Sequence, residues 1–526
     1  MLSAAVLVLV LVIGRSVRFD LQFDGLHTRQ KHPDGIQVVL VPCRFYNGTG
    51  PSIRGPEGKA KRMSPWNDRF TAWFPFGKAP FAILVIGVLA TVWQLMHPVD
   101  RQAAGLELWT FAPSHYQAYK EALPDFEAKE HVEVDLKLVA GGPPLISRLR
   151  AAFWADLEVP DLVEIEITQA GGFFQGVEED IGFTDLKPYL EKDQLLDRIV
   201  QSRFSPFSHR GRIYGMPHDV HPVMLGYRKD LFEKAGIDPE KMETWDDLIR
   251  AGRRITRTSD VDPDNPVYMI EMTRTSRTPL DTCLFQRGGG YFDADGNLIM
   301  DNEVSVQNML WYVPLVAGPK RIGQSLVGIQ PFVKAVTRGS VWCFFCPDWR
   351  SKMVEQWMPH LRGKLALMPL PAFERGGLRT STWGGTMIGI TRKCKDKDRA
   401  WRLAKHLYLN MDDLERRFLD TNILPPIREI WATEAFQAPR DFWDGQRVGK
   451  MYAELAVKTP PQYAHPYLAL ATNKIGEALS TCATHYETLC EDGLTSEEER
   501  AFEAFVRACL KHNADEVRRQ MQRNPF

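Results

Sequence analysis

The sequence has no excess of charge of either sign. Its 526 residues include 65 Lys and Arg against 66 Asp and Glu, which gives a formal net charge of -1. A chain without a net positive field has no long-range attraction for nucleic acid or for an anionic membrane surface. We therefore expect no nucleic-acid partner.

Cysteine is scarce, with eight residues in 526. They do not form the dense framework of a small disulfide-stapled domain. The motif Cys343-Phe344-Phe345-Cys346 follows Val341-Trp342 at an expected strand end, whereas a redox-active pair sits at the start of a helix. It predicts a disulfide or two buried thiols rather than redox catalysis. Cys482 and Cys490 lie about two turns apart in an expected helix, too far for a bridge.

Signatures of catalysis are missing too. The sequence contains no nucleophile elbow, no phosphate loop and no HExxH metal helix. Binding without catalysis and without a cofactor is therefore favoured. The alternative is an extracellular glycosidase, whose two carboxylates would be Glu164 with Glu166 or Asp219.

One long apolar run is present, at residues 80–96 (PFAILVIGVLATVWQLM). Its length is about the minimum for a helix that crosses a bilayer. Arg69 and Lys78 precede the run, which predicts an N-terminus inside and the chain after residue 100 outside. Because no cleavage site follows, we expect an uncleaved single-pass anchor in the cell membrane. A removed signal peptide and a buried core helix are the alternatives.

The segment 1–79 before this run is expected to be a cytoplasmic N-terminal extension. Residues 14–62 are polar, rich in Gly and Arg and without sustained periodicity, which predicts disorder. Met63, followed by Ser-Pro-Trp, offers an alternative start of translation. That start would place residues 1–62 outside the functional chain.

From Gly105 the pattern alternates between strand and helix. Strands are predicted at 106–109, 132–139 and 161–165, with helices at 114–129 and 145–157 between them. This order implies an α/β fold with a parallel sheet covered by helices. Ligands of such sheets bind beyond the carboxyl ends of the strands. A second unit begins near Met224, and the end of the chain is expected to be mostly helical.

The order of short segments over about residues 105–431 resembles the family 1 extracellular solute-binding proteins of bacteria, the group of the maltose-binding protein. The segments that carry the resemblance are Pro160-Asp161-Leu162-Val163, Gly211-Arg212-Ile213-Tyr214-Gly215-Met216-Pro217, Gly226-Tyr227-Arg228-Lys229-Asp230-Leu231-Phe232, Thr244-Trp245-Asp246-Asp247-Leu248, Gly288-Gly289-Gly290-Tyr291-Phe292, Leu367-Met368-Pro369-Leu370-Pro371 and Trp383-Gly384-Gly385.

The resemblance implies a two-lobed type II periplasmic-binding fold that closes around its ligand by a hinge motion. Residues 105–220 and 341–384 would form lobe one, and 221–340 and 385–526 lobe two with an extended helical C-terminus. The implied function is delivery of a sugar or related polyol to the permease subunits of an ABC importer, in the periplasm or extracellular space. A membrane-anchored ligand sensor or docking module is the alternative.

Sugar sites combine polar side chains that take hydroxyls with aromatic faces that cover the ring. Trp349 and Trp383, the latter followed by Gly384 and Gly385, lie in segments that resemble cleft-lining loops of the family. Trp109 is expected at the cleft edge of its strand. Core packing is the alternative for each tryptophan.

Polar candidates follow the predicted strands. The candidates are Ser114, His115, Glu166, Thr168 and Gln169 in the first unit, Asp219 and His221 at the expected crossing between lobes, and Arg274 and Ser276 in the second unit. Asp219 and His221 share one side of an extended chain. A metal site at His218, Asp219 and His221 is disfavoured, because these ligands crowd into one short stretch. Structural or surface roles remain the alternatives for all these residues.

Overall fold

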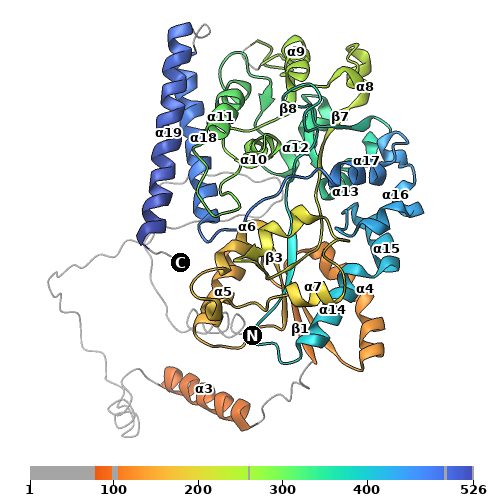
Figure 1. The fold of residues 1–526 in the computed structure, drawn as a ribbon, viewed down its shortest axis with the longest axis vertical. Helices are drawn as coiled ribbons and strands as arrows, with labels where there is room; N and C mark the ends of the chain where they lie inside the picture. Colours follow the sequence, from red (N-terminus) through yellow and green to blue (C-terminus); the bar gives the residue numbers. More distant parts are fainter. Residues whose placement is uncertain (1–77, 97–104, 259–260, 491–494, 524–526) are drawn as a thin grey trace, which may run out of the picture. The chain divides into compact units, whose positions relative to one another are not determined.

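The computed structural model describes residues 78–96, 105–258, 261–490 and 495–523 (Figure 1). The predicted disorder and alternative start at residues 1–62 fall outside these ranges. Residues 1–99 and 100–526 form separate units. The second unit contains both sheets and the candidate site.

Helix α3 (Lys78–Met96) covers the predicted apolar run. Its side chains include Ile86, Leu89 and Trp93, which are exposed. Over the residues that the structure describes, no helix combines the length and the apolar character needed to cross a membrane. The expected transmembrane anchor is therefore not supported.

The first lobe is built on a five-stranded sheet with the order β2-β1-β3-β12-β6. Its parallel strands alternate with helices as the sequence pattern predicts. In α4, buried residues from His115 to Phe126 recur at helical spacing, and Pro113 opens the helix. The elements of this lobe are β1 (Leu106–Thr110), α4 (Pro113–Glu130), β2 (Val134–Leu138), α5 (Pro143–Trp154), β3 (Leu162–Glu166), α6 (Ile167–Ala170), α7 (Lys187–Lys192), β4 (Ser208–His209), β5 (Arg212–Ile213), β6 (Met216–Pro217), β12 (Thr386–Ile390) and α14 (Lys397–Leu409).

The second lobe is built on a sheet with the order β11-β7-β10-β8-β9. Its helix α9 starts at a capping box, in which Thr244 and Asp247 satisfy each other's backbone N–H groups. The elements of this lobe are β7 (Val223–Arg228), α8 (Lys229–Lys234), α9 (Trp245–Ile255), β8 (Tyr268–Glu271), α10 (Thr278–Gln286), α11 (Glu303–Val316), β9 (Gly323–Gln324), α12 (Ile329–Arg338), β10 (Val341–Pro347), α13 (Asp348–Trp357) and β11 (Leu365–Pro369).

Two expected lobe assignments differ from this topology. Residues 341–384 were expected in lobe one, but β10 and β11 both pair with β7 in the second sheet. Residues from 385 onward were expected in lobe two, but β12 pairs with β3 in the first sheet. All three strands are apolar and buried, so their composition does not distinguish the two sheets.

The Cys343–Cys346 motif lies within β10, where alternate side chains point to opposite faces of the sheet. Cys343 packs into the core on one face and Cys346 into the core on the other. Both are free thiols, and burial raises the pKa of Cys346 to about 12. Of the two alternatives, the buried thiols are confirmed and the disulfide is wrong.

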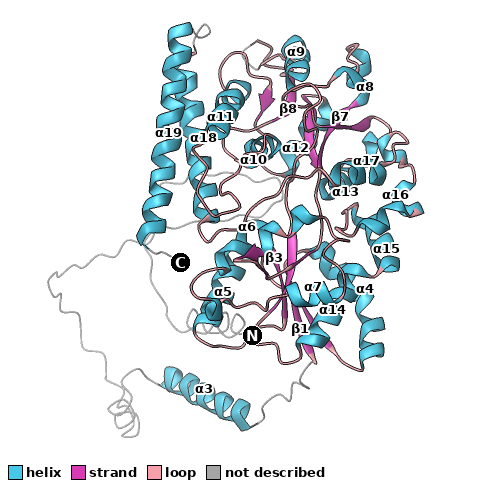
Figure 2. Cartoon of the chain, viewed as in Figure 1, coloured by secondary structure: helices cyan, strands magenta, loops and turns pink. Residues whose placement is uncertain are grey.

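The C-terminal region divides into two parts (Figure 2). Helices α15 (Met411–Thr421), α16 (Glu434–Gln437) and α17 (Val448–Ala456) cover one face of the second sheet. Helices α18 (Leu468–Leu489) and α19 (Ser496–Arg523) pack against each other and against α11. The segment 457–467 connects the two parts.

Candidate functional site

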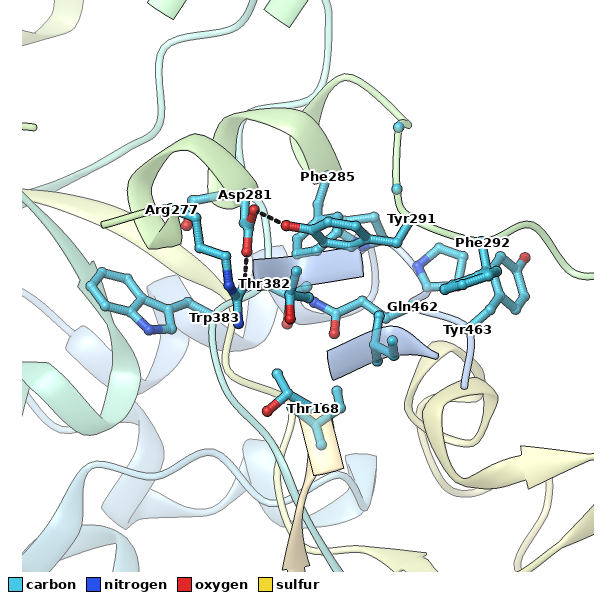
Figure 3. Close-up of a pocket in the computed structure, with 18 of the residues that line it drawn as sticks. Thr168, Arg277, Asp281, Phe285, Tyr291, Phe292, Thr382, Trp383, Gln462 and Tyr463 are labelled. Atoms are coloured by element: carbon cyan, nitrogen blue, oxygen red, sulfur yellow. Dashed lines mark hydrogen bonds and ion pairs between the residues drawn. The ribbon is translucent and has the colours of Figure 1, made fainter. Parts of the chain in front are cut away.

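A cavity of about 540 Å³ lies between the two lobes (Figure 3). Lobe one contributes Glu166, Ile167 and Thr168, at the carboxyl end of β3. Lobe two contributes α10 and the loop after it, and the crossing at Thr382–Gly384 forms another wall. This is the edge at which an α/β sheet is expected to bind its ligand.

The charged side chains at the start of α10 are paired with each other. Arg277 forms an ion pair with Asp281, and the Tyr291 hydroxyl donates to the same carboxylate at 2.5 Å. Burial alone would lower the pKa of the Arg277 guanidinium, but Asp281 outweighs it and raises that pKa. The only guanidinium that lines the cavity is thus neutralised within the protein.

Aromatic rings form much of the lobe-two side of the cavity. Phe285, Tyr291 and Phe292 lie along it, and Tyr463 closes it from the C-terminal segment (Figure 3). Phe292 stacks on the ring of His465, with centroids 3.8 Å apart. Such flat faces match the C–H face of a sugar ring.

Glu166 is held in place by the start of α6. Its carboxylate accepts the Thr168 backbone N–H at 3.0 Å and also the Thr168 hydroxyl. Burial raises the pKa of Glu166. A carboxyl group and a hydroxyl group therefore face the cavity side by side and can exchange hydrogen bonds with ligand hydroxyls.

Trp383 lies between this cavity and a second one of about 270 Å³. Trp349 Nε1 donates to the Trp383 carbonyl at 3.1 Å, and the two rings meet edge to face with centroids 5.7 Å apart. The following Gly384 has φ +97°, which side chains rarely tolerate, and a Cβ there would lie 3.2 Å from the His221 ring. The two cavities therefore share one aromatic wall.

The second cavity is lined by α12, α13 and the loop after β8. Arg350 pairs in bidentate fashion with Glu271, at 2.7 and 3.0 Å, and its guanidinium lies 4.2 Å from the Phe332 ring centre. Trp357, Trp349 and Ser276 complete the wall. Here too the lining cation is already paired.

Asp219 and His221 were predicted as ligand contacts, but they are buried in the crossing between lobes. His221 lies between the carboxylates of Asp219 and Asp348. Arg203 donates to the Asp219 carbonyl at 3.0 Å, the Thr382 hydroxyl at 3.1 Å and the Gly384 carbonyl at 3.1 Å. The segment with Asp219 and His221 and the segment with Thr382 and Gly384 are the two crossings between the lobes. These residues hold the two crossings together and do not line either cavity.

The first-strand candidates lie inside lobe one. Trp109 is 6% exposed and its Nε1 donates to Glu107 at 2.8 Å. His115 Nδ1 lies 3.1 Å from Glu164, which is fully buried. Burial would raise the pKa of Glu164, but His115 and its other partners lower it to about 2. Glu164 therefore has no access to a ligand, which removes it from the glycosidase alternative.

The fourteen predicted residues thus divide by position. Glu166, Thr168, Trp383 and Gly384 line the first cavity, and Ser276, Trp349 and again Trp383 line the second. The others line neither cavity: Trp109, His115, Asp219 and His221 are buried, Ser114 is exposed on α4, Gln169 bonds to Thr168, Arg274 pairs with Glu487, and Gly385 lies against Arg203.

Several lining residues were not predicted as contacts. Tyr291 and Phe292 belong to a segment that carries the family resemblance, but nothing in their spacing marks them as lining residues. Gln462 and Tyr463 come from the C-terminal segment, far along the chain from the other walls. The Pro460-Pro461 pair before them indicates a loop, which is a weak signal for a binding site.

His218, Asp219 and His221 do not form a metal site. Across the described ranges of the chain, no group of three or more His, Cys, Asp or Glu residues is arranged to hold a metal ion. His218 Nδ1 lies 3.1 Å from Asp219, and burial lowers the pKa of His218 to about 4. The carboxylate between the two imidazoles is occupied by its protein partners.

Comparison with known proteins places this site in context. Residues 112–412, more than half of the chain, match the family model described as bacterial extracellular solute-binding protein. The arabinooligosaccharide-binding protein of Halalkalibacterium halodurans is 28% identical over 65% of this chain and 75% of its own length. That of Bacillus subtilis is 26% identical over 71% of this chain and 86% of its own length.

Solved structures agree on the fold. The sugar-binding protein MalE from Xanthomonas citri superposes with a TM-score of 0.61 at 17% identity, covering 80% of this chain and 100% of its own. An ABC transporter-associated binding protein from B. animalis subsp. lactis, in complex with beta-1,6-galactobiose, gives 0.59 at 18% identity, covering 79% and 98%. The predicted two-lobed type II fold is confirmed.

Binding without catalysis was predicted from the missing catalytic motifs and from the family resemblance. The family match confirms this expectation, because its members bind solutes. The match ends at residue 412, so the C-terminal segment that closes the cavity lies beyond it. This chain belongs to the bacterial extracellular solute-binding protein family.

Proposed function

We propose that this protein binds a neutral oligosaccharide between its lobes, outside the cytoplasm, and delivers it to an ABC importer. The observation that carries the proposal is the composition of the first cavity. Aromatic rings, hydroxyls and the carboxyl groups of Glu166 and Asp281, whose pKa values burial raises, line it from both lobes, as a polyhydroxylated ligand requires.

Charge argues against an anionic ligand. The charged residues that line the first cavity are Glu166, Arg277, Asp281 and Asp293. The only cation among them is paired with Asp281. A phosphate or carboxylate group would have to be desolvated without a free positive partner, which is costly.

Size argues for more than one sugar ring. The first cavity, at about 540 Å³, is within the usual range of small-molecule sites, and Trp383 also borders the second cavity, which adds about 270 Å³. Relatives named as arabinooligosaccharide-binding and a fold neighbour bound to a galactobiose support a ligand of this class. Trp383 would then cover rings on both of its sides.

Both lobes and the crossing contribute walls, so a bound ligand would favour the closed arrangement of the lobes. The importer would distinguish the closed, loaded form from the open form. Extracytoplasmic placement of residues 105–526 follows from the same family membership.

Isothermal titration calorimetry of the full chain tests the proposal. The panel would pair neutral ligands, namely arabinooligosaccharides, galactobiose, lactose and maltotetraose, with arabinose and sugar phosphates. We expect an oligosaccharide to bind more tightly than its monosaccharide and sugar phosphates not to bind. A sugar phosphate bound more tightly than every neutral sugar would contradict the proposal.

A further inference from the structure

Two cysteines meet between the last two helices of the chain. Cys482 is fully buried on α18, and Cys509 on α19 is partly exposed. Each thiol shifts the pKa of the other, and the two helices that carry them pack against each other. The Cys509 sulfur also lies 4.0 Å from the carbonyl of Ala478, one turn before Cys482 on α18. The two sulfurs are thus placed together by the packing of the helices.

The surroundings hold this arrangement in place. Leu479 on α18 and Val506 and Leu510 on α19 belong to one continuous apolar core around the pair. The side chain of Asn513 donates to the Cys509 sulfur at 3.8 Å and to the Cys509 carbonyl at 2.9 Å. Cys490, the next cysteine along the chain, instead contacts Tyr486.

The pair sits in a part of the molecule that reaches the candidate site. The first turns of α18 supply Leu468 and Thr472 to the wall of the first cavity. The same end of α18 contacts α6 of the first lobe. Joining α19 to α18 would therefore reinforce a helix that contacts both lobes.

We propose that Cys482 and Cys509 form a disulfide bond that links α18 to α19 in the mature protein. The family is extracellular, and thiols in such compartments are exposed to oxidants. The oxidant is a small disulfide such as oxidised glutathione or a disulfide exchange catalyst. The bond closes a loop between two long helices and so restricts the unfolded chain.

The reaction proceeds by two exchange steps. The Cys509 thiolate attacks one sulfur of the small disulfide, forms a mixed disulfide and releases one reduced thiol. Cys482 then loses its proton and attacks the Cys509 sulfur, which releases the second reduced thiol. Two protein thiols are oxidised, and one small disulfide is reduced to two thiols.

The two cysteines are suited to different steps of this exchange. The neighbouring Cys482 thiol lowers the pKa of Cys509, which favours the Cys509 thiolate. Cys509 is also the partly exposed member of the pair, so a reagent in solvent can reach it. Cys482 is fully buried, so a reagent in solvent cannot reach it, and it is left to attack the mixed disulfide on Cys509 in the second, internal step.

Peptide mapping of the secreted, full-length protein tests the proposal. Free thiols are alkylated under denaturing conditions without reductant, and the protein is digested with trypsin. We expect a linked pair of peptides, residues 475–500 joined to 508–511, which separates on reduction. Because the longer peptide also holds Cys490, the same link must persist in Cys490→Ser. Alkylated Cys482 and Cys509 after treatment with oxidised glutathione would overturn the proposal.

Thermal unfolding gives a second readout. The disulfide should raise Tm by about 4 °C in the oxidised protein relative to the reduced one. In Cys509→Ala, reductant should leave Tm unchanged, and in Cys490→Ser it should lower Tm as in the parent. Equal sensitivity of Cys509→Ala and the parent to reductant would assign the effect to another pair and contradict the proposal.

Discussion

His221 in the first crossing and Asp348 at the start of α13 form a buried ion pair, with His221 Nδ1 2.6 Å from Asp348 Oδ1. The other ring nitrogen of His221 lies 3.1 Å from Asp219. A single imidazolium therefore joins the chain between the lobes to a helix of lobe two. Both carboxylates are almost completely buried, so each depends on protein partners for its charge.

This arrangement predicts a loss of stability at alkaline pH. Burial would lower the pKa of His221, but Asp219 and Asp348 raise it to about 9, against about 6.5 in an unfolded chain. The ion pairs of protonated His221 therefore stabilise the folded state in full below about pH 6.5. This stabilisation is lost as the pH rises through about 9 and His221 loses its proton. Urea unfolding of the parent should therefore show a decline in the free energy of unfolding between about pH 6.5 and 9.

Two variants distinguish the contribution of His221 from the titration of other groups in the protein. His221→Gln should be less stable than the parent at pH 6 and should lose much of the decline toward pH 9. His512→Gln is the control, because His512 is 72% exposed on α19. A parent protein with equal stability at pH 6 and 9, or a control that flattens the profile equally, would exclude His221 as the source.

Arg203 is predicted to stabilise the hinge. It is 1% exposed and donates to the carbonyl of Asp219, the hydroxyl of Thr382 and the carbonyl of Gly384, so it joins both crossings. Arg203→Met leaves these acceptors without a donor and should cost about 3–5 kcal/mol.

The matched control is Arg198→Met, which removes an exposed ion pair with Glu429 at 2.6 Å and should cost about 1 kcal/mol or less. Arg203→Lys keeps the charge but not the planar fork, so we expect intermediate stability. Chemical denaturation of the three variants measures the differences. Equal losses for Arg203→Met and Arg198→Met would show that the crossings do not depend on Arg203.

Trp383 and Tyr463 are predicted to hold the ligand by stacking. Trp383 lines both cavities, and Tyr463 closes the first from the C-terminal segment. Removal of either ring by alanine should weaken the best oligosaccharide about tenfold or more, since a buried aromatic face is lost. Calorimetry measures the change, and circular dichroism verifies the fold.

Trp154→Ala is the control for aromatic loss, because Trp154 is 92% exposed at the end of α5. It should bind as the parent does. An unchanged affinity in both Trp383→Ala and Tyr463→Ala would contradict the placement of the ligand in these cavities.

The alternating α/β order of the first unit could be predicted, because strand and helix periods alternate clearly there. The partners of β10 and β12 could not, since a strand buried on both faces carries no mark of its sheet. Asp219 and His221 were predicted to share one side of an extended chain, but His221 has φ +57° and its ring pairs with Asp348, 127 residues away. Such contacts depend on tertiary packing rather than on local spacing.

The same limit applies to the cavity. Glu166, Thr168 and Trp383 could be predicted, because they follow a strand end or lie in a segment with a family resemblance. Gln462 and Tyr463 reach the cavity because the segment before α18 contacts both lobes, through His465 beside Gly171 of lobe one and Phe292 of lobe two. No local pattern in that segment differs from an ordinary surface loop.

The pairing of Arg277 with Asp281 predicts that charge selectivity can be reversed. Asp281→Asn keeps the shape of the side chain and a hydrogen-bond acceptor for Tyr291, but it leaves the Arg277 guanidinium in the cavity without its counter-ion. We expect weaker binding of the neutral oligosaccharide and new binding of its uronic acid or phosphate analogue.

Asp293→Asn is the control, because Asp293 lines the same cavity but bonds to Asn297 within its own turn. Calorimetry with each ligand pair gives the ratio of affinities, which should change in Asp281→Asn and stay the same in Asp293→Asn. If both variants shift the ratio equally, the net charge of the cavity rather than the Arg277–Asp281 pair determines selectivity.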